Sequence, residues 1–74
     1  MDVEFSNHSE QRLKQRQKIK KSMVLETINN PDAKQGSYKD RLVLRKNYGK
    51  EILEVVCKKE DNKIIVITQY LLET

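Results

Sequence analysis

The stretch RLVLRKNYGKEILEVVCKKEDNKIIVITQY, residues 41–70, decides the fold of this chain. Three runs rich in β-branched and aliphatic residues, 40–46, 51–59 and 63–72, are separated by the short turn sequences NYGK and EDNK. Such runs joined by tight turns predict antiparallel strands connected as a meander. The preceding segment AKQGSYK, 33–39, predicts a weaker edge strand, whose lysines discourage pairing with another chain.

Two helices are predicted ahead of these strands. Ser6 or Asn7 is a suitable N-cap, and the absence of Gly, Pro and β-branched residues favours helix through about Gln17. Ser22 offers a second N-cap before MVLETINN, and the sequence NNPD ends that helix because Pro31 biases the residue before it away from helical geometry.

The order helix, helix and then strands predicts the fold class. With 74 residues the chain is expected to form a single domain, 1–74. We expect an α+β fold with two N-terminal helices packed on one face of a three- to four-stranded antiparallel β-meander.

Alternation along the strands assigns their side chains to two faces of the sheet. The apolar face is expected to pack under the helices, and it carries Leu42, Leu44, Leu53, Val55, Cys57, Ile65, Ile67 and Leu71. The opposite face is amphipathic, and it carries Arg41, Val43, Arg45, Ile52, Glu54, Val56, Lys58, Ile64, Val66, Thr68 and Tyr70. A surface of this second kind suits a partly covered groove.

The charge of the chain narrows the class of partner. The formal net charge is +4, and residues 10–21 hold six cations against one acid. A basic segment of this kind is typical of a protein that binds a polyanion, nucleic acid first, although a solvated helix face has the same composition. No apolar run has the length of a membrane span or a signal-peptide core, so we expect a cytoplasmic protein that does not enter membranes.

One row of side chains on the first helix carries the candidate chemistry. His8, Arg12 and Arg16 are spaced four residues apart, which brings them near one another on the helix surface. Histidine can move a proton near neutral pH, and the planar arginine side chain binds phosphate well. The alternative is a structural histidine bonded to backbone, with arginines in surface ion pairs. One Cys and one His cannot supply a tetrahedral zinc set, so no metal and no cofactor is expected.

The chain resembles a known family in three places. FSNHSEQRLKQRQ carries an H-x3-R-x3-R pattern, INNPD ends a helix, and the last strand closes on VITQY. These features are similar to the small prokaryotic domain-of-unknown-function family 4258, over nearly the whole chain. The resemblance implies a relation in fold to the RelE and BrnT toxin-like ribonucleases, a RelE/barnase-like arrangement of two helices on an antiparallel sheet.

The same resemblance implies a function and a set of site residues. The protein would be a toxin-like, metal-independent endoribonuclease of a toxin–antitoxin system, with RNA as substrate and an antitoxin protein as partner. His8 would be the general acid or base, and Arg12, Arg16 and Arg45 would neutralise the phosphate. Tyr70 would donate a hydrogen bond or stack on a base. The supporting residues would be Arg41, Glu54, which would share the proton transfer if it is close to His8, and Thr68.

Two other functions fit the same residues. A non-catalytic module could hold nucleic acid by phosphate contacts alone, with the histidine and arginines as positioning groups. A protein-interaction module could use the amphipathic sheet face as its interface. The sequence leaves all three possibilities open.

Overall fold

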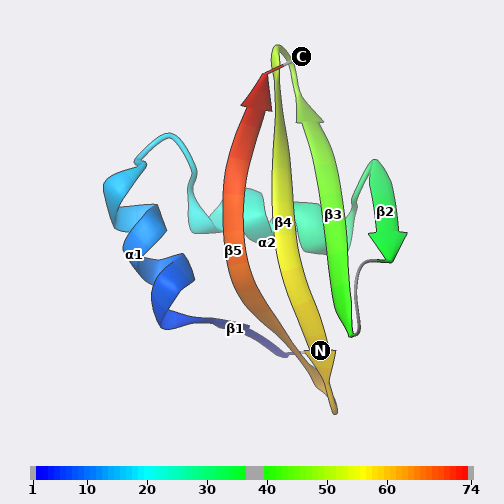
Figure 1. Cartoon of the computed structure of the whole chain (residues 1–74). Helices are drawn as coiled ribbons and strands as arrows, with labels where there is room; N and C mark the ends of the chain where they lie inside the picture. The colour runs from blue at the N-terminus through cyan, green and yellow to red at the C-terminus, as the bar shows by residue number, and fades with distance from the viewer. Residues whose placement is uncertain (1, 37–39, 74) are drawn as a thin grey trace.

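The computed structural model describes residues 2–36 and 40–73 of the chain. Its elements are β1 (Asp2–Phe5), α1 (Asn7–Gln15), α2 (Lys21–Asn29), β2 (Ala33–Gly36), β3 (Arg41–Tyr48), β4 (Glu51–Glu60) and β5 (Lys63–Glu73). The strands form one sheet in the order β1-β5-β4-β3-β2, shown in Figure 1. All neighbouring strands are antiparallel except β1 and β5, which run parallel.

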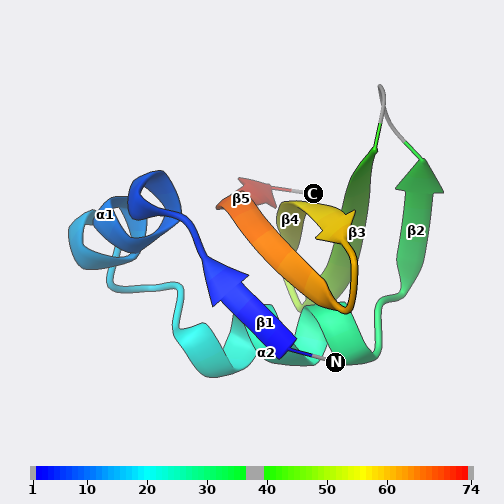
Figure 2. The same cartoon turned by 90° about the horizontal axis from the view of Figure 1, so that it is seen from below.

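The chain is an α+β domain, but the predicted arrangement of a three- to four-stranded meander under two N-terminal helices is wrong. The sheet has five strands and is mixed, and β1 precedes both helices. The helices also do not share a face. Figure 2 shows α2 lying across one face of the sheet, whereas α1 lies beside the outer edge of β5. The RelE/barnase-like arrangement expected from the resemblance is overturned for the same reasons.

The strand β1 was missed because its sequence signal is short. DVEF has only four residues, and two of them are acids, which are uncommon in strands. It forms a strand because β5 offers an unpaired edge, to which residues 2–5 pair opposite 63–66. Val3 and Phe5 then pack against the core. Because β1 stops at Phe5, it covers only the first part of the β5 edge, and α1 lies against the remainder.

The helix boundaries are partly as predicted. Ser6 caps α1, its hydroxyl accepting a hydrogen bond from the Ser9 amide at 3.1 Å. The helix ends at Gln15, earlier than the predicted Gln17, because the chain must turn to bring Ile19 into the core, where it is 3% exposed. The prediction of Ser22 as the second N-cap is wrong, since Lys20 occupies that position without a side-chain cap bond.

The later boundaries agree more closely with the sequence. The helix α2 ends at Asn29, just before Pro31, as NNPD predicted. The predicted edge strand at 33–39 is present over 33–36, and its last three residues lie outside the described part of the chain.

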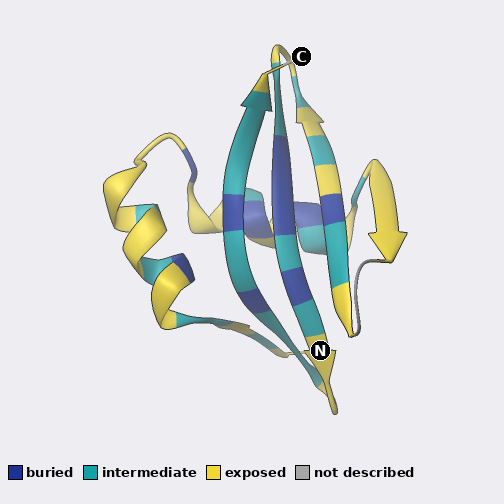
Figure 3. Cartoon of the chain, viewed as in Figure 1, coloured by how far each residue is buried: buried dark blue, intermediate teal, exposed yellow. Residues whose placement is uncertain are grey.

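The core lies between α2 and the sheet, and Figure 3 shows the buried residues gathered where the central strands cross this helix. The buried apolar cluster comprises Ile19, Val24, Leu53, Val55 and Val66. The prediction that Ile65 and Ile67 belong to the core is therefore wrong, and their neighbour Val66 is the core residue of this part of β5.

A β-bulge explains this reversal. Val56 pairs with Thr68, but the next residue of β4, Cys57, pairs with Val66, so Ile67 is an extra residue in β5. An extra residue shifts the alternation by one, which moves every earlier side chain of β5 to the opposite face. Val66 thereby joins Cys57 under α2, while Thr68 and Tyr70 remain on the predicted polar face.

We call the sheet face opposite α2 the open face. Residues that pair across neighbouring strands have their side chains on the same face of the sheet, so the strand register shows which residues belong to the open face. The residues that share the open face are Arg41, Val43, Arg45, Asn47, Ile52, Glu54, Val56, Lys58, Ile65, Thr68, Tyr70 and Leu72.

Burial raises the pKa of two ionisable side chains, Tyr48 and Cys57. The Tyr48 hydroxyl donates to the Glu26 carboxylate, and burial together with this hydrogen bond raises the pKa of Tyr48. Burial raises the pKa of the Cys57 thiol, which lies fully inside the core. A thiol in that position is a small apolar filler rather than a nucleophile.

No helix among residues 2–36 and 40–73 is long and apolar enough to cross a membrane.

Candidate functional site

The start of α1 is fixed at the bulge of β5. The Ser6 amide donates to the Val66 carbonyl at 3.0 Å, and the Ser6 hydroxyl donates to the Ile67 carbonyl at 3.0 Å. These two carbonyls flank the irregular pairing between β4 and β5, and Ser6 also caps the helix. One serine therefore joins the end of β1, the bulge and the first turn of α1.

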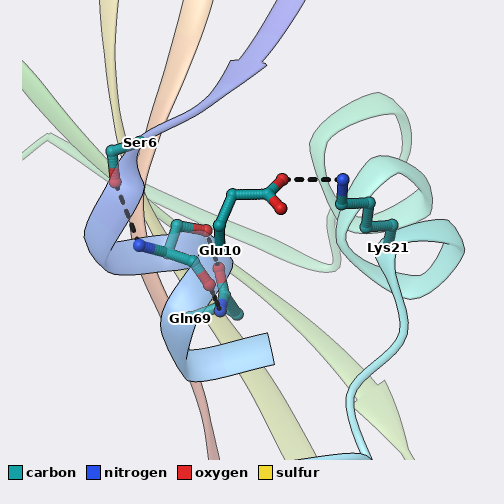
Figure 4. A network of polar contacts seen from close by, with 5 residues as sticks. Ser6, Glu10, Lys21 and Gln69 are labelled. Carbon is teal, nitrogen blue, oxygen red and sulfur yellow. Dashed lines mark hydrogen bonds and ion pairs between the residues drawn. The ribbon is translucent and has the colours of Figure 1, made fainter. Parts of the chain in front are cut away.

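A buried pair of polar side chains, Ser9 and Gln69, holds α1 against β5. The Ser9 hydroxyl donates to Gln69 Oε1 at 2.5 Å, and Gln69 Nε2 donates to the Ser9 carbonyl at 3.1 Å, as Figure 4 shows. Their exposures are 0% and 3%. Buried polar groups lose water on folding, so these two bonds fix the position of α1 along β5.

The ion pair between Glu10 and Lys21 shows in which direction the α1 side chains point. Ser9 faces β5, and Glu10 turns toward α2, where its carboxylate meets Lys21 Nζ at 2.6 Å (Figure 4). At about 100° per residue, Arg12 points roughly 60° and His8 roughly 100° away from Ser9 on the other side of the helix. Because α2 covers one face of the sheet, this other side of α1 borders the open face.

The side chains of α1 and β5 enclose a pocket that we call the α1–β5 groove. Its volume is about 300 Å³, and it is lined by Arg12, Arg16, Thr68, Gln69, Tyr70 and Leu71. Four residues predicted from the sequence thus come together: Arg12 from the helix, Arg16 from the position directly after it, and the threonine and tyrosine from the last strand. The arrangement offers two guanidinium groups and two hydroxyl groups around one small space, which suits a phosphate group.

His8 lies outside the lining of this groove. Its side chain is exposed, one helical turn before Arg12, and it makes no hydrogen bond or ion pair among those of the described residues. Helical geometry places it on the same side of α1 as Arg12, about 6 Å back along the axis. The imidazole is therefore accessible to a ligand that extends from the groove toward the start of α1.

The remaining predicted residues lie farther across the open face. Arg45 Nε and Glu54 Oε1 are 2.6 Å apart, and the Glu54 side chain is only 6% exposed. Glu54 is the cross-strand partner of Tyr70, so β5 separates it from α1 and from His8. Arg41 is four residues from Arg45 along β3, or about 13 Å. The structure therefore does not bring Glu54 to His8, and it pairs Arg45 with an internal carboxylate.

Gln69 and Leu71 were not among the predicted site residues. Strand alternation puts them on the opposite face from Thr68 and Tyr70; Leu71 was assigned to the apolar face, and Gln69 was assigned to neither. The groove runs along the edge of β5, however, so residues of both faces line it. Only the knowledge that this part of β5 lies at an edge of the sheet would have identified them, and no pattern in the sequence shows it.

A second pocket, which we call the terminal pocket, adjoins the groove. Its volume is about 400 Å³, and it is lined by Gln15, Arg16, Gln17, Lys18, Ile19, Glu51, Leu71 and Glu73.

Within the described parts of the chain, no three His, Cys, Asp or Glu side chains gather closely enough to hold a metal ion.

Comparison with known proteins gives one match. No curated protein and no solved structure matches the chain. A family model described as a domain of unknown function, DUF4258, matches residues 5–70. The matched segment begins just before α1 and ends at Tyr70, so it contains both arginines and the threonine and tyrosine of the groove. The chain therefore belongs to the DUF4258 family.

Proposed function

We propose that the protein binds RNA in the α1–β5 groove and cleaves it as a metal-independent endoribonuclease of the toxin type. The observation that supports this proposal is the meeting of Arg12 and Arg16 with Thr68 and Tyr70 around one pocket. Guanidinium groups bind phosphate through paired hydrogen bonds, and a hydroxyl can donate to a further phosphate oxygen.

RNA supplies its own nucleophile for this reaction. The ribose 2′-OH attacks the adjacent phosphorus, the bond from phosphorus to the 5′ oxygen breaks, and the products are a 2′,3′-cyclic phosphate and a 5′-hydroxyl. In our proposal the His8 imidazole acts as the general base that takes the proton from the 2′-OH, and a water molecule on the opposite side of the phosphorus protonates the departing 5′ oxygen. Arg12 and Arg16 offset the negative charge that grows on the phosphate during the attack.

Binding without cleavage is the second candidate function. It is favoured by one observation, the exposure of His8 outside the groove lining, since no contact among the described residues holds the imidazole against Arg12. In that case α1 and β5 would form a phosphate-binding surface, and His8 would contribute only to the contact with the nucleic acid.

An antitoxin protein is the partner that the nuclease proposal requires. With a net charge of +4 and two arginines at the groove, the protein would pair with an acidic segment. We propose that this segment covers the groove, which would block RNA by occupying the same guanidinium groups.

Replacement of His8 separates the two candidate functions. We expect His8→Ala to lower the rate of RNA cleavage by at least about 100-fold, the usual contribution of a general acid–base group, without weakening RNA binding. The matched control is Gln11→Ala, which truncates an exposed side chain elsewhere on the same helix. Cleavage is followed on a labelled oligonucleotide, and binding by fluorescence anisotropy.

Two outcomes would contradict the catalytic proposal. If His8→Ala cleaves RNA as fast as Gln11→Ala, the assignment of His8 is wrong. If the wild-type protein binds RNA and leaves it intact, the protein is a binding module. Loss of binding in a variant with both Arg12 and Arg16 replaced by Ala supports the groove in either case.

A further inference from the structure

The side chains that line the α1–β5 groove differ in the hydrogen bonds they can form. The guanidinium groups of Arg12 and Arg16 donate and cannot accept, and Leu71 does neither. Gln69 is 3% exposed, and its Oε1 already accepts from the Ser9 hydroxyl. The accessible side-chain acceptors of the groove are therefore two hydroxyl oxygens.

These acceptors belong to Thr68 and Tyr70, and neither hydroxyl forms a hydrogen bond within the described residues. The phosphate oxygens of a nucleic acid only accept, so the arginines satisfy them, whereas an acceptor in the protein needs a donor in the ligand. The ribose 2′-OH is the donor of the RNA backbone, and the DNA backbone lacks it. A hydroxyl in the groove is therefore suited to distinguish ribose from deoxyribose.

Two hydrogen bonds fix the order in which residues of α1 and β5 face each other. The Ser6 hydroxyl donates to the Ile67 carbonyl, and three residues later the Ser9 hydroxyl donates to Gln69 Oε1. The helix and the strand therefore advance in the same direction along this edge. A residue of α1 between the two serines lies level with the strand residue between their two partners.

Thr68 is that strand residue, and His8 lies one position before Ser9 on the helix. Thr68 belongs to the open face, and helical geometry puts His8 on the side of α1 that borders this face. Tyr70 is two residues further along β5, or about 7 Å. Of the two hydroxyls, that of Thr68 is therefore the one beside the proposed general base.

We propose that the Thr68 hydroxyl accepts a hydrogen bond from the ribose 2′-OH and thereby makes the groove selective for RNA over DNA. This inference rests on the proposed function and names the residue that recognises the sugar. The contact belongs to the bound state, before any proton passes to His8, so it applies to RNA binding with or without cleavage.

The experiment compares three short uracil oligomers that differ only at the 2′ position. They carry a hydroxyl, a hydrogen or a fluorine there, and the fluorine keeps the ribose-like sugar conformation without supplying a donor. The His8→Ala protein is used throughout, so that cleavage does not consume the RNA. By fluorescence anisotropy at low salt we expect RNA to bind about fivefold more tightly than the other two, the scale of one hydrogen bond.

Three substitutions in the same protein assign the preference to one hydroxyl. Thr68→Val removes the hydroxyl and keeps the β-branched shape that suits a strand, and it should bind all three oligomers equally. Thr68→Ser retains a hydroxyl and should keep the preference. The matched control is Tyr70→Phe, which removes the other hydroxyl of the groove and should also keep the preference.

Four outcomes would overturn the inference while leaving nucleic-acid binding in place. They are equal affinity for all three oligomers, binding of the 2′-fluoro oligomer as tight as that of RNA, a preference that survives in Thr68→Val, and a preference that is lost in Tyr70→Phe. Failure to bind any of the oligomers at low salt would instead overturn the proposed function itself. Circular dichroism of each variant checks that the fold is kept.

Discussion

At the scale of single residues, Gln69 shows how a polar side chain can organise a site. It is 3% exposed, it lines the α1–β5 groove, and both of its described hydrogen bonds go to Ser9. The helix that carries Arg12, and that Arg16 directly follows, is therefore attached to β5 through polar contacts as well as through the packing of Leu13. Loss of one partner leaves the other buried without its hydrogen bond.

This contact gives a prediction for stability. Ser9→Ala removes the donor to Gln69 Oε1 in a site with no exposure, and we expect the free energy of unfolding to fall by about 1–3 kcal/mol. The control Ser22→Ala, at an exposed position of α2, should change it by less than about 0.5 kcal/mol. Urea denaturation followed by circular dichroism measures both. Equal effects of the two substitutions would show that the Ser9–Gln69 contact contributes nothing to stability.

At the scale of elements, the edges of the sheet explain the placement of the site. One edge is covered first by β1 and then by α1, and the change occurs at the bulge where Ser6 binds the Val66 and Ile67 carbonyls. The groove lies along this second part of the edge. At the far edge, β2 and the tight turn between β3 and β4 complete the sheet, and Gly49 in that turn has φ +80°.

The two glycines allow a matched test of the turn. An added Cβ meets nothing within 4 Å at either Gly36 or Gly49, so packing does not distinguish them. Gly49→Ala places a side chain in left-handed backbone and should lower the free energy of unfolding by about 1–2 kcal/mol. Gly36→Ala lies in a strand and should be neutral or slightly stabilising. Thermal unfolding of the two variants measures this difference in stability, and equal melting temperatures would contradict the left-handed conformation of Gly49 in the turn.

At the scale of the whole molecule, the helix α2 covers one face of the sheet, and no described helix covers the other. The two arginines of the groove, Arg12 on α1 and Arg16 directly after it, lie beside this open face. Arg41 lies on the open face too, but at the end of β3 remote from the row of Tyr70. Nucleic acid bound at the groove would therefore be held from one side of the molecule.

The salt dependence of RNA binding tests this asymmetry. If Arg12 and Arg16 each neutralise one phosphate, replacing either by Ala should reduce the slope of log affinity against log salt by about 0.7, the value for a single-stranded contact. Arg41→Ala carries the same loss of charge at a position outside the groove and should leave the slope nearly unchanged. A titration of a labelled oligonucleotide at several salt concentrations measures the slopes, and equal changes for all three variants would contradict a localised site.

The sequence alone identified the local features that depend on neighbouring residues. Strand periodicity located β3, β4 and β5, and NNPD located the end of α2. The four-residue spacing of His8 and Arg12 placed these two on one side of α1, whereas Arg16 lies just beyond the end of that helix. Alternation also assigned Thr68 and Tyr70 correctly to the face away from α2. These features follow from backbone propensity and periodicity, which act over a few residues.

The tertiary structure alone decided where the helices lie and which residues meet at the groove. The parallel pairing of β1 and the contact between Ser9 and Gln69 join segments about sixty residues apart, and no local pattern encodes them. The extra residue Ile67 lies between the neighbouring strands β4 and β5, where it is set by their pairing and not by the composition of either strand. A bulge of one residue reverses the faces of a strand without changing its composition, so Val66 and Ile65 could not be assigned from alternation. The sequence determined which elements form, and long-range pairing determined how they enclose a site.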